Sequence, residues 1–192
     1  MGFHTRKEGT GDFCRYSPWT APFFDNVFRK LFQNPEKIAG LYIRPGMTAM
    51  DIGCGPGFFT LAMARMVGSE GTVIAIDMQQ EMLELVKKKS DRAGLSNRIR
   101  FHRCEPDSLG IREKAGFILS FYMVHEVPDR DALFREVSGL LEDGGRYLIV
   151  EPGMHVSAKA FWDTLRHAEK AGFIIDTRPK VLISRAAVLR RA

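Results

Sequence analysis

The sequence predicts an α/β protein with a mostly parallel sheet and helices on both of its faces. Two observations predict this class. Apolar, β-branched runs alternate with helix-length amphipathic runs between residues 48 and 175, as they do in βαβ units. The last two strand-like runs, 173–175 and 181–183, are separated only by a short turn around Arg178 and Pro179. Parallel neighbours need a crossover of about a dozen residues, so these two strands must be antiparallel.

Each expected strand is a short apolar run bounded by a loop or a turn. Residues 99–103 alternate between apolar and polar side chains, which is typical of a strand near a sheet edge. A turn is expected over 142–145, before the fifth strand. The seven expected strands cover residues 48–52, 72–77, 99–103, 117–124, 147–150, 173–175 and 181–183.

Helices between these strands are predicted by their caps and apolar stripes. Asp129 and Ser157 are of the residue types that cap helix N-termini, and Gly94 stands where a C-terminal cap glycine belongs. The helix that follows Asp129 presents a stripe of leucine, phenylalanine and valine every three to four residues. Helices are therefore expected over 58–67, 81–93, 130–141 and 158–171.

The first 44 residues differ from the rest because aromatic side chains crowd them. They carry Phe3, Phe13, Tyr16, Trp19, Phe23, Phe24, Phe28 and Phe32. Helices are expected over 21–32 and 35–41, the second with Asn34 as N-cap and Pro35 at its first position. Such aromatic spacing fits either packing onto the domain or a lid over a pocket. We assign 1–37 to an N-terminal lid segment and 38–192 to the main domain.

Composition and charge exclude several classes of protein. Hydrophobic residues make up 45% and charged residues 27% of the 192 positions, which excludes a disordered chain. No apolar run is long enough to span a membrane, so no membrane partner is expected. The absence of a secretory signal and three widely spaced cysteines predict a cytoplasmic protein. The net charge of +5 equals the charge of residues 178–192, which could be a solvated terminus or a nucleic-acid contact.

A glycine-rich loop follows the first strand and opens the first helix of the main domain. Its glycines are Gly53, Gly55 and Gly57, and their spacing lets a ligand lie against the backbone. The dinucleotide pattern GxGxxG requires another glycine where Phe58 stands. Asp51 before the loop would also lie badly beside a pyrophosphate. The loop therefore favours a ligand that is cationic or neutral at this point.

Acidic residues end the next two strands, at the same edge of the sheet. Asp77 follows Gly57 by 20 residues, where a carboxylate accepts hydrogen bonds from ribose hydroxyls. Glu105 and Asp107 follow the third strand. A nucleoside without phosphate fits these acids better than a dinucleotide does.

Five ordered segments are similar to the class I S-adenosylmethionine-dependent methyltransferases. They are DIGCGPG, VIAIDM, RCEP, FILSFYMVHEVPD and LLEDGGRYLIVEP. The similarity covers residues 38–192 and is greatest to the small-molecule branch that includes the ubiquinone/menaquinone biosynthesis methyltransferases. It implies a Rossmann-like sheet of seven strands with the seventh antiparallel, and S-adenosyl-L-methionine as cofactor.

The resemblance also implies the cofactor contacts. The three loop glycines would line the amino-acid part of the cofactor, Asp77 would hold the ribose, Met78 would pack on the adenine, and Glu105 would lie near its amino group. Members of the family often carry Asp where this chain has Glu105. Further cofactor contacts are expected from Asp51, Cys54, Pro106 and Phe121.

Two histidines and two glutamates follow the fourth and fifth strands and are the candidate catalytic residues. They are His125, Glu126, Glu151 and His155. Ligands of open α/β sheets bind at the carboxyl ends of the strands, so we expect all four to face the acceptor pocket. Three roles remain open: structural hydrogen bonding, a histidine general base for a hydroxyl or thiol, or a divalent metal site.

Only four residues, 153–156, separate the fifth strand from the next helix, so no insert closes the acceptor pocket. Residues 1–33 or a second subunit of a homodimer would close it, or it stays open to a large substrate. No Asn-Pro-Pro-Tyr motif follows the fourth strand, which argues against an amide or adenine N-methyltransferase.

The leading prediction is a methyltransferase acting on a small or medium-sized acceptor. The alternatives are a silent S-adenosylmethionine-binding module that acts through partners, an RNA methyltransferase guided by the basic tail, and a nicotinamide-dependent oxidoreductase. The lack of a separate RNA-binding domain argues against nucleic acid, and Phe58 argues against the oxidoreductase.

Overall fold

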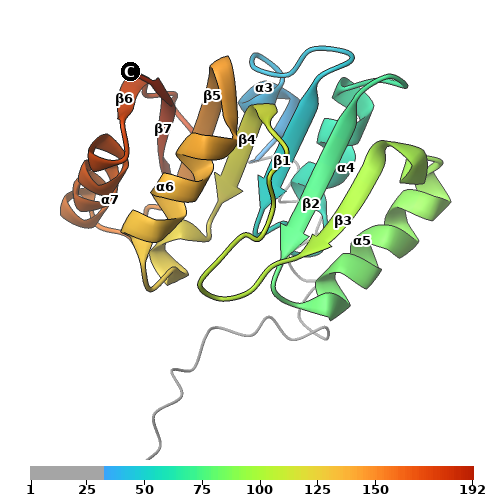
Figure 1. Cartoon of the computed structure of the whole chain (residues 1–192), viewed down its shortest axis with the longest axis horizontal. Coiled ribbons are helices and arrows are strands. Elements are labelled where there is room, and N and C mark those ends of the chain that lie inside the picture. Colours follow the sequence, from blue (N-terminus) through green and yellow to red (C-terminus); the bar gives the residue numbers. More distant parts are fainter. Residues whose placement is uncertain (1–32) are drawn as a thin grey trace, which may run out of the picture.

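Seven strands form one sheet in the computed structural model, which describes residues 33–192 (Figure 1). Residues 1–32 of the predicted lid segment 1–37, and with them the predicted helix over 21–32, lie outside the described residues. The sheet order is β3-β2-β1-β4-β5-β7-β6, with β7 antiparallel to both of its neighbours and the other pairings parallel. The strands are β1 (Thr48–Ile52), β2 (Thr72–Asp77), β3 (Ile99–Arg103), β4 (Ala115–Phe121), β5 (Leu141–Pro152), β6 (Phe173–Thr177) and β7 (Ser184–Arg191).

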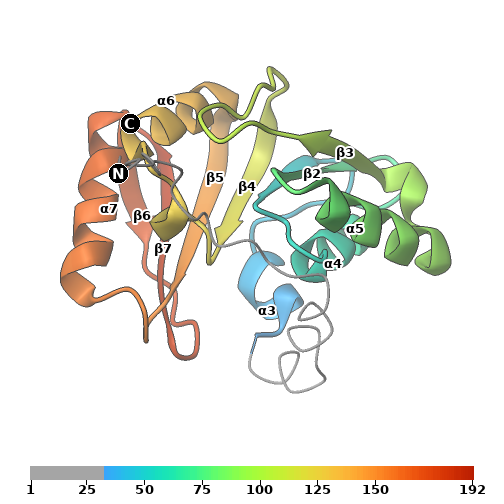
Figure 2. The same cartoon turned by 90° about the horizontal axis from the view of Figure 1, so that it is seen from below.

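Helices cover both faces of this sheet, as the alternating pattern predicted. Figure 2 shows α3, α4 and α5 on one side and α6 and α7 on the other. Successive strand residues point to opposite faces of the sheet. Phe117 therefore packs in the hydrophobic core on one face, and Ile118 packs in the core on the other face. The helices are α3 (Pro35–Ala39), α4 (Phe58–Met66), α5 (Gln80–Ala93), α6 (Arg130–Leu140) and α7 (Ala158–Lys170), with short 3₁₀ turns at Ser96–Arg98 and Val124–Glu126.

The predicted helix caps are confirmed. The Asn34, Asp129 and Ser157 side chains accept hydrogen bonds from the backbone N–H groups of Lys37, Ala132 and Ala160. Gly94 ends α5 with a φ of 65°, in the left-handed region that glycine adopts without steric penalty. Helix α3 ends at Ala39, two residues before the predicted end, and the other predicted helix ends are correct to within one residue.

The last predicted strand is wrong. Residues 181–183 form a turn, and the strand begins at Ser184. The apolar run at 181–183 was the misleading signal, because Leu182 and Ile183 are exposed, whereas the small and aliphatic residues 186–189 are buried. Residues 184–191 of the basic tail are therefore a strand and not a solvated terminus, whereas Arg178 and Lys180 before it are exposed. Arg190 pairs with Asp176 and Arg191 with Asp143.

The bounds of β4, β5 and β6 also differ from the prediction. Strand β4 stops at Phe121, since Tyr122 has a φ of 62° and leaves the sheet. Residues 142–145 belong to the long strand β5, but a shift of register shows that they bulge there. The predicted edge position of β3 is confirmed.

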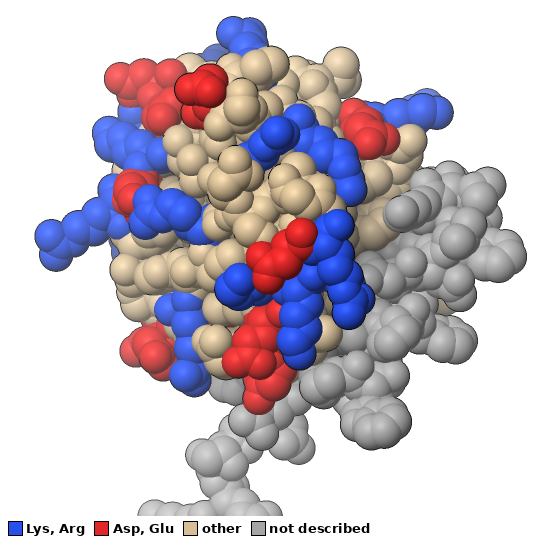
Figure 3. Space-filling model, turned by 90° about the vertical axis from the view of Figure 1, so that its right-hand side faces the viewer, with Lys and Arg blue, Asp and Glu red and all other residues tan. Residues whose placement is uncertain are grey.

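Charges of both signs occupy the side of the molecule formed by β3 and α5 (Figure 3). Several of the basic side chains there are paired: Lys87 lies 3.0 Å from Asp91, and Arg100 contacts Glu113. Pairs this exposed contribute little to stability, on the order of 0–1 kcal/mol. Within residues 33–192, no helix is long and apolar enough to cross a bilayer.

Candidate active site

A cavity of about 430 Å³ opens at the carboxyl ends of the strands, where open α/β sheets bind their ligands. It is lined by the glycine loop, the turns after β2 and β3, the loop after β4, and Gln33. Seven carboxylate residues line it, and no lysine, arginine or histidine is among the described residues that do so. The acids are Asp51, Asp77, Glu105, Asp107, Glu126, Asp129 and Glu136. The cavity therefore favours a cationic or neutral ligand over a phosphate.

The glycine loop takes backbone conformations that other residues rarely adopt. Gly53 and Gly57 have φ values of 71° and 85°. A Cβ on Gly53 would lie 2.9 Å from the Met123 side chain, and one on Gly57 would lie 2.9 Å from Val86. A Cβ on Gly55 would meet nothing within 4 Å, because that residue faces the cavity. Two of the glycines thus permit close packing, and the third borders the ligand space.

Asp77 is held by the backbone on both of its carboxylate oxygens. It accepts hydrogen bonds of 2.9 Å from the N–H of Gly55 and the N–H of Gln79. Burial raises the pKa of this carboxyl, although these hydrogen bonds oppose the shift. A carboxylate has about four lone-pair sites, so Asp77 can accept two further hydrogen bonds from a ligand. This capacity fits the two hydroxyls of a ribose.

Asp51, Cys54 and Cys104 are buried residues of the cavity lining. The hydroxyl of Thr60 donates to Asp51 at 2.6 Å and orients its carboxylate. Burial raises the pKa of Cys54 well above its usual value and that of Cys104 to about 11. Burial therefore favours the protonated form of both thiols.

The turn after β3 forms another part of the cavity lining. Glu105 and Ser108 exchange backbone hydrogen bonds, with Pro106 and Asp107 at the tip. Met78 lies on the neighbouring turn after β2, half-buried. All of these residues line the cavity, as the adenine assignment requires.

Four aromatic rings form another wall. Phe59 lies between Phe58 and Phe121, at ring-centroid distances of 5.3 and 4.3 Å. Tyr122 extends the row, 4.3 Å from Phe121. All four residues line the cavity. Such a wall offers π faces to a cation or to a planar ring.

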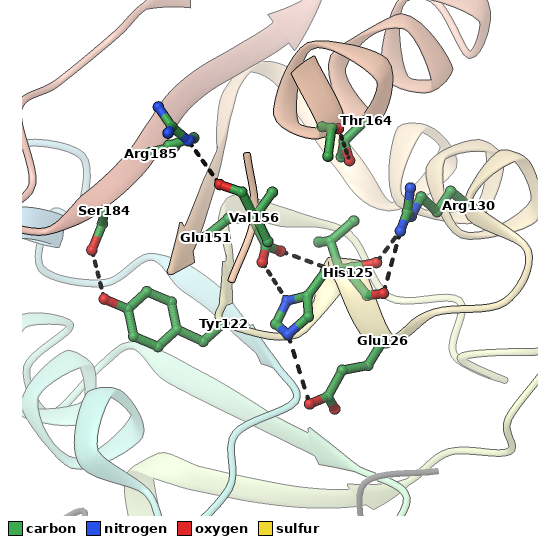
Figure 4. A network of polar contacts seen from close by, with 11 residues as sticks. Tyr122, His125, Glu126, Arg130, Glu151, Val156, Thr164, Ser184 and Arg185 are labelled. Carbon is green, nitrogen blue, oxygen red and sulfur yellow. Dashed lines mark hydrogen bonds and ion pairs between the residues drawn. The ribbon is translucent and has the colours of Figure 1, made fainter. Parts of the chain in front are cut away.

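His125 lies between two carboxylates behind the cavity (Figure 4). Its Nδ1 hydrogen-bonds to the fully buried Glu151, which also accepts the His125 backbone N–H at 3.3 Å. Its Nε2 lies 3.8 Å from the Glu126 carboxylate. The bond to Glu151 raises the pKa of the imidazole, and burial raises the pKa of Glu126. Arg130 donates to the carbonyl oxygens of Val124 and His125 and holds this loop in place.

The sequence model of the family described as "Methyltransferase domain" matches residues 43–174. The chain belongs to this methyltransferase family. Demethylmenaquinone methyltransferase of Lactobacillus johnsonii is 31% identical over 66% of this chain and 50% of its own length. The ubiquinone/menaquinone biosynthesis C-methyltransferase UbiE of Idiomarina loihiensis is 30% identical over 60% of this chain and 47% of its own. The chain thus spans about half the length of these curated relatives.

Solved structures agree on the methyltransferase fold. An S-adenosylmethionine-dependent methyltransferase from Aquifex aeolicus superposes with a TM-score of 0.81 at 22% identity, covering 91% of this chain and 98% of its own. An S-adenosylmethionine-dependent O-methyltransferase from Thermotoga maritima gives 0.67 at 22% identity, covering 83% and 66%. Identities this low show the shared fold only. S-adenosylmethionine is the cofactor of the family, and the acidic lining fits its sulfonium and ammonium groups.

The methyltransferase site brings together most of the residues expected from the sequence. Nine of the ten expected cofactor contacts line the cavity, and Gly57 is the exception. Of the four candidate catalytic residues, only Glu126 does so, and His125 and Glu151 lie directly behind it. His155 is exposed, outside the cavity lining. Among residues 33–192, no group of three or more His, Cys, Asp or Glu side chains is arranged to hold a metal ion.

Sequence reasoning did not single out Gln33, Tyr122 or Glu136 for the methyltransferase site. The amide of Gln33 donates to the Tyr122 hydroxyl at 2.7 Å, and Glu136 of α6 accepts the backbone N–H of Leu109 at 2.8 Å. The place of Tyr122 directly after β4 was a usable signal, because loops at this edge bind the ligand. Gln33 belongs to the segment 1–33 that was expected to close the pocket, but no local pattern singles out Gln33 or Glu136, since each reaches the site through tertiary contacts.

Proposed function

We propose that the chain transfers the methyl group of S-adenosylmethionine to a small acceptor that is neutral or cationic and carries a planar ring. The proposal rests on the cavity lining, which contains seven acidic residues and, among the described residues, no basic one. Such a lining repels carboxylate and phosphate acceptors. The same argument disfavours RNA and nicotinamide dinucleotides.

The aromatic wall supports a ring-bearing acceptor. The rings of Phe58, Phe59, Phe121 and Tyr122 follow one another along the cavity. A planar acceptor could stack on this wall with its reacting atom toward Glu126. The curated relatives are named for demethylmenaquinone and for ubiquinone and menaquinone biosynthesis, so a quinol is the first acceptor to test.

The cofactor, when bound, supplies an electrophilic methyl group on a sulfonium. The residues of this chain bind and orient it: the backbone of the glycine loop and Asp51 at the amino-acid part, Asp77 at the ribose, and Met78 and Glu105 at the adenine. The buried aromatic rings exclude water from the path between donor and acceptor.

Glu126 is our proposed proton acceptor. As the bond from the acceptor atom to the methyl carbon forms and the sulfur–methyl bond breaks, the proton of the acceptor passes to the Glu126 carboxylate. The raised pKa of Glu126 makes it a better base than an exposed glutamate. His125 acts as a positioning residue, held by Glu151 with its Nε2 toward Glu126.

Initial rates of methyl transfer to a reduced demethylmenaquinone, a simple phenol and RNA test the proposal. We expect turnover with a ring-bearing acceptor and none with RNA. Glu126→Gln should lower kcat by about 10²- to 10⁴-fold while the affinity for S-adenosylhomocysteine stays intact. The exposed His155→Ala is the matched control and should keep full activity.

The pH dependence of the rate distinguishes the two candidate bases. A cationic His125 lowers the pKa of Glu126, so His125→Asn should move the acid limb of the rate profile to higher pH. Loss of that limb in His125→Asn would instead make His125 the base. Methylation of RNA alone would overturn the proposed acceptor class.

A further inference from the structure

Exposed hydrophobic side chains gather at one corner of the molecule. Within residues 33–192, five large hydrophobic residues are exposed, and four of them belong to this corner. The four are Met154 (86% exposed), Trp162 (42%), Leu182 (55%) and Ile183 (63%), and the fifth is Leu41 (84%). We call the four residues the apolar corner. Clusters of this kind on a monomer mark interaction surfaces, whereas single exposed residues do not.

Specific contacts build this corner from three elements. The loop before α7 meets the loop before β7, where the backbone N–H of Gly153 donates to the carbonyl of Ile183 at 2.9 Å. Figure 2 shows these two loops next to each other. The guanidinium of Arg178 lies 4.6 Å from the ring centroid of Trp162, which ties α7 to the same loop. These contacts hold together the three segments that carry the four hydrophobic side chains.

Ile183 is held in a strained conformation at the tip. Its φ is 58°, which costs a β-branched residue roughly 1–2 kcal/mol. Arg185 donates to the carbonyl of Val156 at 2.8 Å, and Ser184 bonds to Leu182, so the tip is fixed from both sides. Strain of this kind persists where the surrounding structure enforces it, often for function.

Basic residues surround the corner. Arg178, Lys180 and Lys159 are exposed there, and residues 178–192 contain no acid. The acids nearest in sequence are already paired, Asp163 with Arg166 and Asp176 with Arg146. The corner thus combines aliphatic side chains, a tryptophan and a positive charge, which is the combination that binds anionic lipid surfaces.

We propose that the apolar corner docks the protein on an anionic lipid bilayer. A second copy of the chain fits less well, because a two-fold contact uses the same surface on both copies. It would bring Arg178 and Lys180 of one copy close to the same positive residues of the other. A nucleic acid would contact the basic residues but gain nothing from Met154, Leu182 and Ile183. A lipid surface uses both features at once.

The docked orientation brings the active-site cavity close to the bilayer. The Ser184 hydroxyl, next to Ile183, lies 2.6 Å from the hydroxyl of the cavity residue Tyr122. Surface docking needs no spanning helix, so it agrees with the absence of one from the described chain. It departs from the expectation of no membrane partner, which rested only on the lack of a long apolar run. The proposal does not depend on the acceptor.

Co-sedimentation of the full chain with vesicles tests the proposal. Vesicles of phosphatidylcholine alone are compared with vesicles that also contain phosphatidylglycerol. We expect binding to the anionic vesicles that weakens with salt. Leu182→Ser and Ile183→Gly should each weaken it about tenfold. Glycine suits the φ of 58°, so Ile183→Gly should also keep its melting temperature.

Two variants serve as controls. Leu41→Ser removes a side chain outside the corner that is more exposed than Leu182 and should leave binding unchanged. Lys180→Glu should weaken binding to anionic vesicles about tenfold at low salt. The proposal is overturned if the protein does not bind anionic vesicles, or if Leu41→Ser weakens binding as much as Leu182→Ser does. It is also overturned if gel filtration shows a dimer that Leu182→Ser dissociates.

Discussion

The hydroxyl of Tyr122 lies 2.6 Å from the hydroxyl of Ser184. Within the described chain, the two non-glycine residues with positive φ are Tyr122 and the neighbour of Ser184, Ile183. Tyr122 itself has a φ of 62°, and Ile183 next to Ser184 has 58°. Ser184 can donate to the carbonyl of Leu182 while Tyr122 donates to Ser184 and accepts from Gln33. One tyrosine therefore joins the cavity wall to the turn that precedes β7.

Tyr122→Phe should reveal how much this contact contributes to the stability of the fold. The variant loses the hydrogen bonds of the hydroxyl, so we expect the free energy of unfolding to fall by about 1–3 kcal/mol. A double-mutant cycle with Ser184→Ala, followed by chemical denaturation, checks the assignment. The two changes should be non-additive by at least about 0.5 kcal/mol. Additive effects would show that the two hydroxyls do not interact.

Glu151→Gln should lower the pKa of His125. The variant keeps an acceptor for Nδ1 but removes the carboxylate charge, which is a cause of the raised pKa. An NMR titration of the His125 ring measures the change directly. The pKa should return toward the ordinary histidine value of about 6.5. An unchanged titration would mean that Glu151 does not set the charge of the ring.

The same pair makes stability depend on pH. The folded-state pKa of His125 is raised, so its contribution to stability is fully present below the unfolded pKa of about 6.5. It is lost as the pH rises through the raised folded value. The melting temperatures of the wild type and Glu151→Gln should therefore differ most on the acid side of pH 6.5 and converge at alkaline pH. A gap that widened with pH would contradict this.

Asp77→Ala should weaken cofactor binding. Removal of the carboxylate takes away the acceptor proposed for the ribose hydroxyls, and hydrogen bonds to a charged group contribute about 1.5–3 kcal/mol. Calorimetry with S-adenosylhomocysteine measures the loss. The exposed cavity residue Asp107 provides the control, since Asp107→Ala removes a similar charge without those contacts. Equal effects of both changes would mean that Asp77 contributes to binding only through its negative charge and not through hydrogen bonds to the ribose.

Gly57→Ala should destabilise the protein more than Gly94→Ala. Both positions have positive φ, so alanine at either one costs about 1–2 kcal/mol for its left-handed conformation. Only at Gly57 would the new Cβ lie 2.9 Å from the Val86 side chain, whereas Gly94 has open space around it. Chemical denaturation should show the larger loss for Gly57→Ala, together with weaker cofactor binding. Equal losses would mean that Val86 moves aside at little cost.

Most residues of the cavity that we propose for the cofactor could be predicted from the sequence because they lie in a few local segments. The glycine loop and Asp77 each lie within or next to one strand end, and parallel strands bring their carboxyl ends to the same edge. Prediction was weaker for the acceptor half. His125 and Glu151 are 26 residues apart, and only the pairing of β4 with β5 brings them into contact.

The sequence alone determined the alternation of strands and helices, the helix caps, and the glycine loop and acidic residues at the carboxyl ends of the strands, because these follow from side-chain periodicity and backbone chemistry over a few residues. Only the tertiary structure decided that β7 begins at Ser184, that it inserts between β5 and β6, and that Glu126 faces the cavity while His155 does not. The apolar run at 181–183 carries the pattern of a strand, but sheet hydrogen bonding and burial selected residues 184–191 instead. Strand choice and side-chain direction depend on contacts between distant segments, which no local pattern encodes.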